Sequence, residues 1–560
     1  QSELSGNMID VCPVGALTSK PFRYEARTWQ MNAVQSVARH DLVGSNIFTQ
    51  TYRGKVKRVV ARDNDSVNET WISDRDRFSY EGLNHDSRAL KPKVKKNGEW
   101  LEVEWQEALE FAIEGIKNNA TRPEQLGVLA SKNASLEEYY LMQKLARGFG
   151  TENIDFRLDH ANLSEGSSMD SSINLSEIES VDHALILSSY TRLEQPMINH
   201  RIRKAVINGA TVNTINSKKF DFNFKTKIDL LSSPQALLPT LQSILKSIYV
   251  KTKDDLPEYL SKVTSGEEHN KIAEDLIASE NGVVVIGEHL KGNPNSSVIT
   301  SIISQIALIS NSKIANLTLS GNAHSAEKVG FIPANQGMNA TSMLSESSKA
   351  FLLMDVDCDY DFVNPKLALD LFNKGDVFVV SLTSFKDEST LLSADVILPM
   401  ASFYETSGTH INFDGIAQSF SASVKSPGES KPGWKIIKVM ADLLELEGFD
   451  FIDSSQVAEE ALLSSKAQTN IDGSNAQSFE DSDIATLWQY APYAIDNVTR
   501  RAESLQESNI GKINSAYISK STAKKLNLDQ DDLYLGVPVS ISDDVAEDCV
   551  FVHTSQARKV

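Results

Sequence analysis

The residue best suited to bind a metal is Cys12, and Pro13 follows it directly. A cysteine thiolate is a soft ligand for iron, and a proline after it fixes the backbone and removes a competing N–H group. Cys-Pro is also the last part of a C-x2-C-x2-C…C-P iron–sulfur pattern. A lone cysteine is otherwise commonly a small buried hydrophobic residue. Spacing alone therefore leaves both an iron–sulfur ligand and a structural cysteine open.

The other two cysteines are Cys358 and Cys549. Cys358 lies in the acidic stretch 355–359, where neighbouring carboxylates would raise its pKa and suppress the thiolate. Cys549 lies in an apolar run that is typical of a strand, so we expect both to be structural. The sequence has no H-E-x-x-H or C-x-x-C motif, which argues against a self-contained zinc site.

A further position of interest is the loop at 285–292, which follows an apolar run and could meet a phosphate at the start of a helix. It has neither G-x-G-x-x-G spacing nor a Walker lysine, which favours an ordinary strand-to-helix turn. Composition and spacing alone therefore define no active site.

The chain has 560 residues, too many for one hydrophobic core, so at least two domains are expected. Its 55 basic and 75 acidic residues give a net charge of −20, which argues against nucleic-acid binding. No apolar run approaches the roughly 20 residues that span a bilayer. Three cysteines are too few for a secreted disulfide framework. Because the chain begins with Gln1, we expect a fragment or a processed chain.

The elements that would position these residues follow from hydrophobic periodicity. Two alternating runs at 45–52 and 55–61, joined by Arg53-Gly54, predict a β-hairpin, and the spacing at 105–113 predicts an amphipathic helix. From about residue 125, short apolar runs alternate with helix-length segments, which is typical of a parallel α/β sheet covered on both faces. The runs lie at 126–130, 184–187, 283–287, 351–354, 377–380 and 396–398. Six runs exceed the need of one Rossmann-like unit, which indicates two α/β domains.

The predicted fold is therefore α/β, with two Rossmann-like parallel-sheet domains, a small N-terminal β region and a small C-terminal β unit. The predicted division is 1–30 for an N-terminal module, 31–85 for a small β domain, 86–155 with 345–450 for one α/β domain, 156–344 for the second, 451–510 for a Ser-rich and acidic insert, and 511–560 for the C-terminal unit.

Several stretches resemble the 75-kDa iron–sulfur subunit of respiratory complex I, the G subunit of proton-pumping NADH:quinone oxidoreductase. The first spans residues 5–18, Ser-Gly-Asn-Met-Ile-Asp-Val-Cys-Pro-Val-Gly-Ala-Leu-Thr, and continues to 27–29. In that family the segment closes a ferredoxin-like region, and its cysteine is the fourth ligand of a 4Fe-4S cluster. The resemblance implies that Cys12 is this ligand and that its three partner cysteines lie upstream of Gln1. We then expect no cluster in the 560-residue chain by itself.

A second resembling stretch covers 43–47 and 71–78. Some bacterial relatives carry an extra 4Fe-4S cluster here, held by four cysteines. The corresponding positions in this chain are Ala38, Asp41, Ser45 and Ser73. None of them supplies a thiolate, so the resemblance implies a degenerate domain without this extra cluster.

A third set of blocks resembles the molybdopterin oxidoreductase fold of the formate dehydrogenase type. These blocks lie at 153–157, 194–205, 394–399, 405–409, 412–415 and 427–429. A similar fold does not imply that the protein carries out molybdenum chemistry. Molybdenum enzymes usually place Cys, selenocysteine or Ser on the metal after the first α/β strand, but the complex I relatives bind none, so Ser131 is not expected to be a ligand. Glu405 and Asp414 are expected to hold a loop rather than to act as acid or base, with Gly408 permitting a turn.

The resemblance implies an electron-transfer and scaffold subunit with 4Fe-4S and 2Fe-2S clusters in the intact protein and no molybdenum. It would pass electrons from the NADH-oxidising flavoprotein toward quinone. Implied partners are that flavoprotein, the 24-kDa-type and 49-kDa-type subunits and a ferredoxin-like subunit, without nucleic acid or a membrane span. The implied location is the peripheral arm of complex I, on the cytoplasmic side of the bacterial inner membrane. Two alternatives remain open: a molybdopterin-dependent dehydrogenase, and a non-catalytic interaction scaffold.

Overall fold

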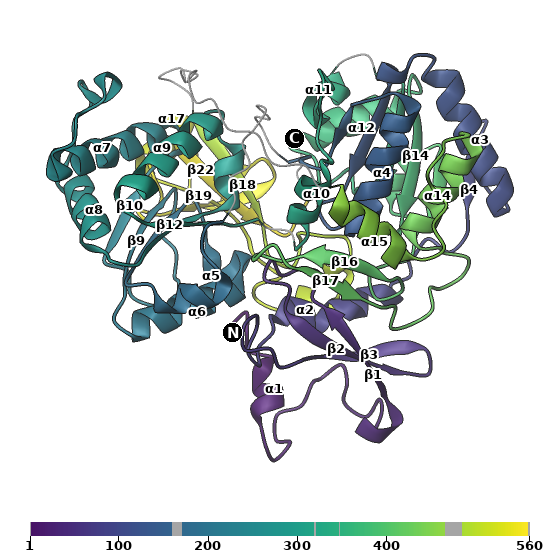
Figure 1. Ribbon diagram of the computed structural model, residues 1–560, viewed down its shortest axis with the longest axis horizontal. Coiled ribbons are helices and arrows are strands. Elements are labelled where there is room, and N and C mark those ends of the chain that lie inside the picture. The colour runs from purple at the N-terminus through teal and green to yellow at the C-terminus, as the bar shows by residue number, and fades with distance from the viewer. Residues whose placement is uncertain (1, 160–170, 319–320, 346–347, 465–483, 558–560) are drawn as a thin grey trace.

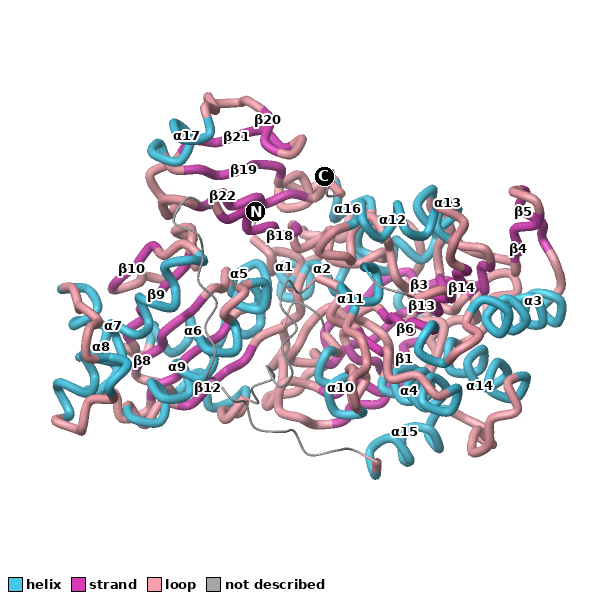
Figure 2. Tube along the Cα trace, turned by 90° about the horizontal axis from the view of Figure 1, so that it is seen from above, coloured by secondary structure: helices cyan, strands magenta, loops and turns pink. Residues whose placement is uncertain are grey.

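The computed structural model describes residues 2–159, 171–318, 321–345, 348–464 and 484–557. Two α/β units lie side by side in it, with a small sheet of N-terminal residues below one of them (Figure 1). A further sheet near the C-terminus forms a separate layer when the molecule is seen from above (Figure 2). None of the helices in the described ranges is long and apolar enough to cross a membrane.

The N-terminal part consists of a short helix, a long loop and a three-stranded antiparallel sheet. Its elements are α1 (Asn7–Val11), β1 (Asn32–Val37), β2 (Asn46–Tyr52), β3 (Lys55–Ala61) and α2 (Asp74–Phe78). The predicted hairpin at 45–61 is confirmed as β2 and β3. Arg53 and Gly54 both adopt positive φ angles of 50° and 74°, the conformation that a tight two-residue hairpin turn requires.

The first α/β unit contains a seven-stranded sheet in the order β5-β4-β15-β14-β13-β6-β7. Its strands are β4 (Lys93–Lys96), β5 (Glu99–Glu102), β6 (Leu126–Ala130), β7 (Ile154–Asp155), β13 (Ala350–Met354), β14 (Phe378–Thr383) and β15 (Val396–Pro399). The strands from β15 to β7 are parallel, while the β4–β5 hairpin adds an antiparallel edge. The predicted helix at 105–113 is confirmed as part of α3 (Trp105–Asn119).

Helices cover both faces of this sheet. One face packs against α3, α4 (Leu136–Phe149), α10 (Ala323–Val329), α14 (Gly433–Leu443) and α15 (Ser454–Leu463). The other packs against α11 (Ala340–Ser345), α12 (Pro365–Asn373) and neighbouring residues of α13 (Glu388–Ser393). The second unit was expected to extend to residue 344, yet α10 and α11 pack on the first, because Ala326 and Met343 are buried in its cores.

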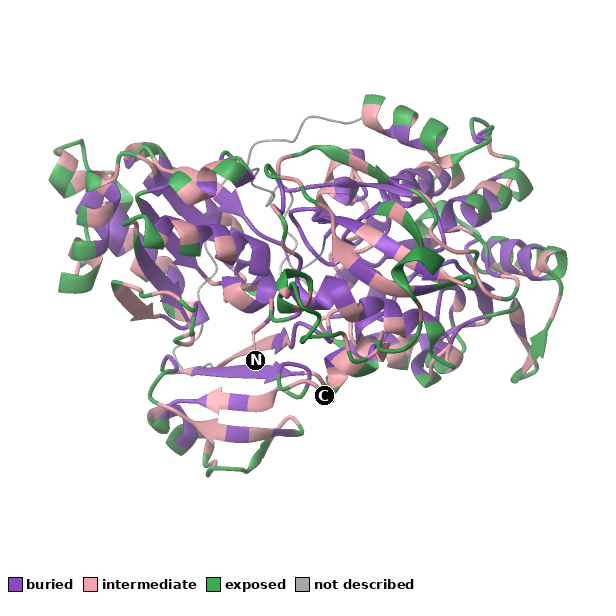
Figure 3. Cartoon of the chain, turned by 90° about the horizontal axis from the view of Figure 1, so that it is seen from below, coloured by how far each residue is buried: buried purple, intermediate pink, exposed green. Residues whose placement is uncertain are grey.

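The second α/β unit has an all-parallel five-stranded sheet in the order β10-β9-β8-β11-β12. Its strands are β8 (His183–Leu187), β9 (Thr211–Asn216), β10 (Ile228–Leu231), β11 (Gly282–Ile286) and β12 (Lys313–Asn316). Its helices are α5 (Thr191–Glu194), α6 (Pro196–Ile207), α7 (Pro234–Thr252), α8 (Glu267–Ala278) and α9 (Ser296–Ile309). The buried cores lie between these helices and the sheet, and Figure 3 shows buried residues gathered in both sheets.

All six predicted core strands are present, as β6, β8, β11, β13, β14 and β15, and the prediction of two parallel α/β sheets is correct. The strand β9 carries no such signal, because its sequence Thr-Val-Asn-Thr-Ile-Asn is largely polar although five of its six residues are buried.

The C-terminal sheet has the order β18-β22-β19-β21-β20. Its strands are β18 (Ala485–Tyr490), β19 (Asn514–Ile518), β20 (Leu533–Tyr534), β21 (Val537–Ile541) and β22 (Cys549–Thr554), with helix α17 (Lys520–Leu526) between β19 and β20. It therefore begins inside the range 451–510 that was expected to be an insert. That range also contains α15 and α16 (Glu503–Gln506). Residues 465–483 of the same range lie outside the described residues. A two-stranded hairpin, β16 (Gly408–Ile411) and β17 (Ala417–Phe420), completes the fold.

Candidate functional site

Cys12 lies at the carboxyl end of α1, at the start of a loop that reaches β1. The side chain is only partly buried, and nearly all of residues 13–20 are exposed. Hydrogen bonds from the backbone amides of Leu17 and Val14 lower the pKa of the Cys12 thiol. Gly15 takes a φ of 63°, a left-handed conformation that brings the loop around the sulfur. A partly exposed thiol within a loop of amide donors is an arrangement suited to a soft metal ion.

Among the described residues no group of three or more His, Cys, Asp or Glu side chains is arranged to hold a metal ion. Cys12 alone cannot complete a four-cysteine site. Cys358 and Cys549 are both fully buried and far along the chain, as expected for structural residues. Burial raises the pKa of Cys358, and burial raises that of Cys549 to about 12.

The four positions that correspond to the extra cluster of some relatives form one buried polar cluster. The amide of Ala38 donates to the Ser45 carbonyl at 2.8 Å, and the Ser45 hydroxyl donates to Asp41. The Ser73 hydroxyl donates to Asp76 at 2.6 Å. Burial, with the nearby charge of Asp76, raises the pKa of Asp41 to about 7. Hydrogen-bonded hydroxyl and carboxylate groups stand at three of these four positions and alanine at the fourth, so none of them supplies a thiolate. These residues therefore do not fit an iron–sulfur cluster.

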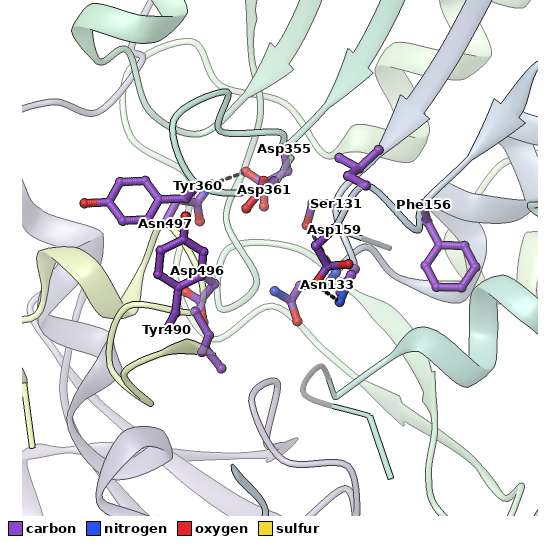
Figure 4. A pocket seen from close by; sticks show the side chains of 13 residues that line it. Ser131, Asn133, Phe156, Asp159, Asp355, Tyr360, Asp361, Tyr490, Asp496 and Asn497 are labelled. Carbon is purple, nitrogen blue, oxygen red and sulfur yellow. Dashed lines mark hydrogen bonds and ion pairs between the residues drawn. The ribbon is translucent and has the colours of Figure 1, made fainter. Parts of the chain in front are cut away.

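A pocket lies at the carboxyl ends of β6 and β13, which are neighbouring parallel strands. After β6 the chain continues to β7 on one side of this strand pair, and after β13 it continues to β14 on the other side. In open α/β sheets, ligands usually bind where successive connections diverge in this way. Figure 4 shows Ser131, Asn133 and Asp159 on one side of it, and Asp355 and Asp361 on the other.

Side chains from three parts of the chain meet at the edge of this pocket. Arg39 donates to Asp355 at 2.8 Å, and Asn497 donates to the other oxygen of Asp355 at 2.7 Å. The Nδ1 atom of His40 lies 2.7 Å from a carboxylate oxygen of Asp496. Burial opposes the charge on Asp496, but His40 and Arg39 lower its pKa well below the usual range. The loop after β13 is thus tied to the N-terminal β region and to the segment after β18.

The remaining space is about 70 Å³, which is room for a few water molecules. Ser131 uses its hydroxyl oxygen to accept from the Asn133 amide at 3.1 Å, and its carbonyl accepts from the Tyr139 hydroxyl at 2.6 Å. An extended pterin cofactor needs far more room than this, and the Ser131 hydroxyl and both Asp355 carboxylate oxygens already accept hydrogen bonds within the protein. The residues at this crevice therefore do not fit a molybdopterin.

Next to this pocket a charged triad joins the two α/β units. The ammonium group of Lys132 lies 2.5 Å from Asp159 and 2.9 Å from Glu288, which follows β11 of the second unit. Burial opposes the charge on Lys132, but the two carboxylates raise its pKa above the ordinary value. The loop at 285–292 is thus a strand-to-helix turn, as predicted, and its glutamate holds the units together.

The remaining residues singled out from the sequence have structural contacts. Glu405 accepts two hydrogen bonds from the Arg88 guanidinium, at 2.8 and 2.6 Å, and Asp414 accepts from the Leu175 amide at 2.7 Å. The expectation that Gly408 permits a turn is wrong, because Gly408 begins strand β16. A Cβ atom there would lie 2.8 Å from the Phe420 ring, so close packing is what requires glycine.

Sequence reasoning missed the role of Arg39, His40, Asp355 and Asp496. The acidic stretch after β13 was noticed only for its effect on Cys358, although carboxylates directly after a buried parallel strand are a signal for the ligand edge of a sheet. The partners of these carboxylates come from remote parts of the chain, and no local pattern marks them.

A comparison with family models matches residues 88–443 to the molybdopterin oxidoreductases, and this chain belongs to that family. Residues 31–81 match the NADH-ubiquinone oxidoreductase NDSU1/NuoG-like 4Fe-4S domain. The solved structure of acetylene hydratase from Pelobacter acetylenicus superposes with a TM-score of 0.64 at 13% identity, covering 93% of each chain. At that identity the likeness concerns the fold alone, and it agrees with the predicted fold class.

The chain is also similar to curated proteins that are named as subunits of NADH dehydrogenase, which confirms the resemblance drawn from the sequence. The NADH-quinone oxidoreductase G subunit of Rickettsia bellii is 29% identical over 457 residues, covering 80% of this chain and 60% of the relative. The NADH-ubiquinone oxidoreductase 75 kDa subunit of Reclinomonas americana is 26% identical, with 79% and 62% covered. The mitochondrial iron-sulfur protein 1 of NADH dehydrogenase from Solanum tuberosum is 30% identical, with 79% and 55% covered. The chain thus spans about three fifths of the length of these relatives.

Proposed function

We propose that this chain is the large α/β part of an iron–sulfur electron-transfer subunit of NADH:quinone oxidoreductase, and that Cys12 is the fourth ligand of a 4Fe-4S cluster. The observation that carries the proposal is the place of Cys12, a partly exposed thiol with amide donors from Val14 and Leu17 around it. The other three ligands, and the 2Fe-2S cluster, would come from protein outside this chain. When bound, the cluster supplies one-electron transfer.

The role of the remaining chain in this proposal is to hold that cluster in a rigid surround and to present docking faces. Electrons would pass from the NADH-oxidising flavoprotein toward quinone. The partners would be that flavoprotein, the 24-kDa-type and 49-kDa-type subunits and the ferredoxin-like subunit, in the peripheral arm on the cytoplasmic side of the bacterial inner membrane. The similarity to curated NADH-quinone oxidoreductase subunits supports this placement.

The test is Cys12→Ala in the intact NADH:quinone oxidoreductase, read by low-temperature EPR spectroscopy. We expect the signal of one 4Fe-4S cluster to disappear while the other clusters keep theirs. Cys358→Ala and Cys549→Ala are matched controls, because both thiols are buried, and both should leave every signal in place. A Cys12→Ala enzyme with a complete set of signals would disprove the assignment.

The 560-residue chain by itself should be inactive and contain essentially no iron, since of its three cysteines only Cys12 is not buried. Metal analysis of the intact subunit should return no molybdenum, because the crevice beside Ser131 is small and both oxygens of its Asp355 are bonded to Arg39 and Asn497. Stoichiometric molybdenum would favour the alternative of a molybdopterin-dependent dehydrogenase.

A further inference from the structure

Helix α1, which places Cys12, is too short to be stable by itself. It has five residues, and isolated helices of fewer than roughly 12 residues are marginal in water. Of its three apolar residues only Ile9 is partly buried, while Met8 and Val11 are 52% and 58% exposed. Polar contacts therefore contribute much of what fixes the position of Cys12 relative to the rest of the protein.

These contacts join α1 to α2 of the N-terminal β region. Asn7 pairs with the backbone of Ile72 in both directions, donating to its carbonyl at 2.7 Å and accepting from its amide at 3.1 Å. Asp74 accepts from the Gly6 amide at 2.6 Å and from the Ser5 hydroxyl at 2.7 Å. Both Asn7 and Asp74 are buried, so these bonds form without competition from water.

Arg77 continues this contact to the end of α1 that carries the thiol. Its Nη2 atom donates to Asn7 at 2.9 Å and to Asp10 at 2.7 Å. Arg77 is 4% exposed, and its partner Asp10 lies two positions before Cys12. The approach is close enough that a Cβ atom on Gly6 would lie 2.6 Å from the Cδ atom of Arg77.

One guanidinium thus bonds to both the first residue of α1, Asn7, and its fourth, Asp10. A charge-assisted bond to a carboxylate is about twice as strong as a neutral one, and the planar arginine fork has a fixed donor geometry. Loss of Asp10 or Arg77 would remove this bond at the end of α1 next to Cys12, while Gly6 and Asn7 would still hold the amino-terminal end of the helix.

We propose that Arg77, acting through Asp10, is a positioning residue for Cys12, which fixes the sulfur for ligation of the cluster. This inference rests on the proposed function. Residues that orient a metal ligand typically change metal affinity by roughly 10- to 100-fold when they are removed. The effect of Arg77 should therefore appear in the cluster itself and not only in the stability of the fold.

The first experiment uses the intact enzyme and four variants. Arg77→Met and Asp10→Ala should release the iron of the Cys12-dependent cluster to a chelator roughly tenfold faster and change its EPR line shape and midpoint potential. Asp10→Asn keeps an acceptor oxygen but loses the charge, so its release rate should lie between those of the unchanged protein and Asp10→Ala. Arg53→Met, on the exposed β2–β3 turn, is the matched arginine control and should change neither property.

The second experiment measures hydrogen–deuterium exchange in the 560-residue chain, which needs no cluster. In Arg77→Met the amides of residues 8–12 should exchange faster, while those of β13 remain protected. Asp10 is partly exposed, with 33% of its side chain accessible, so Asp10→Ala should fold even if Arg77→Met does not.

The outcomes separate the inference from the function on which it rests. If Cys12→Ala leaves every EPR signal intact, the proposed function fails. If Cys12→Ala removes a signal but Asp10→Ala and Arg77→Met show unchanged iron release, line shape and potential, the cluster assignment stands and the positioning role is overturned. Unchanged exchange at residues 8–12 in both variants would also overturn it.

Discussion

The guanidinium of Arg39 donates a 2.8 Å hydrogen bond to the carboxylate of Asp355 across a separation of 316 residues. Arg39 follows β1 of the N-terminal β region, and Asp355 follows β13 in the middle of the seven-stranded sheet. Both side chains are buried, at 5% and 3% exposure. This pair therefore couples the part of the chain that carries Cys12 to the large α/β unit.

Replacing Arg39 should destabilise the protein strongly. Arg39→Met leaves the Asp355 carboxylate buried without its cation, and removal of one partner of a buried ion pair costs about 3–5 kcal/mol. Urea unfolding, followed by circular dichroism, should show a lower midpoint. The control is Lys520→Met, whose 2.9 Å pair with Asp543 is 73% and 75% exposed and should contribute less than about 1 kcal/mol. Equal midpoints for the two variants would contradict this account.

The stability of the protein should also depend on pH through Asp41. The folded-state pKa is raised to about 7, because the carboxyl group is buried beside Asp76, so the folded protein binds this proton more tightly than the unfolded chain does. The contribution of Asp41 to stability is complete below the unfolded pKa of roughly 4 and is lost as the pH rises toward 7.

Asp41→Asn removes this dependence while keeping an acceptor for the Val43 amide, which donates to Asp41 at 3.0 Å. The free energy of unfolding of the unchanged protein, relative to the variant, should fall by about 1 kcal/mol or more between pH 5 and pH 8. Denaturant titrations at the two pH values measure this difference. A difference that is constant or that grows with pH would show that Asp41 is ionised in the folded protein.

Much of the fold could be predicted because its signals are local. Runs such as 283–287 are short, apolar and bounded by polar residues, which is typical of a buried parallel strand. Strand β9 was missed because three of its buried residues, Asn213, Thr214 and Asn216, are polar, and a buried amide is tolerated only through partners elsewhere. Asn213, for example, donates to Asp275 at 2.9 Å. Such compensation between remote residues leaves no trace in a sequence window.

The candidate site likewise has one feature that the sequence predicts and one that it does not. Cys12 is a candidate ligand because Cys-Pro places a thiol next to a turn, but this spacing alone leaves a structural cysteine open, and the predicted ligand role comes from the resemblance of residues 5–18. The contacts at the crevice were not predicted, since they join Arg39, Asp355 and Asn497, which come from three separate parts of the chain. A single sequence contains each of these residues but does not show that they are in contact in the folded protein.

Gly82 should tolerate no side chain, because it is where the N-terminal β region meets the segment after β18. A Cβ atom there would lie 2.2 Å from the backbone carbonyl oxygen of Val498, and backbone cannot rotate away. Gly82→Ala should cost about 1–3 kcal/mol of unfolding free energy. Gly292→Ala is the matched control, since nothing lies within 4 Å of its added Cβ atom. Thermal unfolding of both variants tests this, and equal melting temperatures would refute it.

Cys12 should be the one cysteine that an alkylating reagent modifies in the folded chain. Amide donors from Leu17 and Val14 lower the pKa of its thiol, whereas burial raises the pKa of Cys358 and raises that of Cys549 to about 12. Since the thiolate is the reactive form, iodoacetamide at about pH 7.5 should label Cys12 first and reach the other two only after unfolding. Peptide mass mapping gives the site of each label. The Cys12→Ala chain should take up almost no label under the same native conditions, and rapid labelling of Cys358 or Cys549 there would mean that the segments around them open readily.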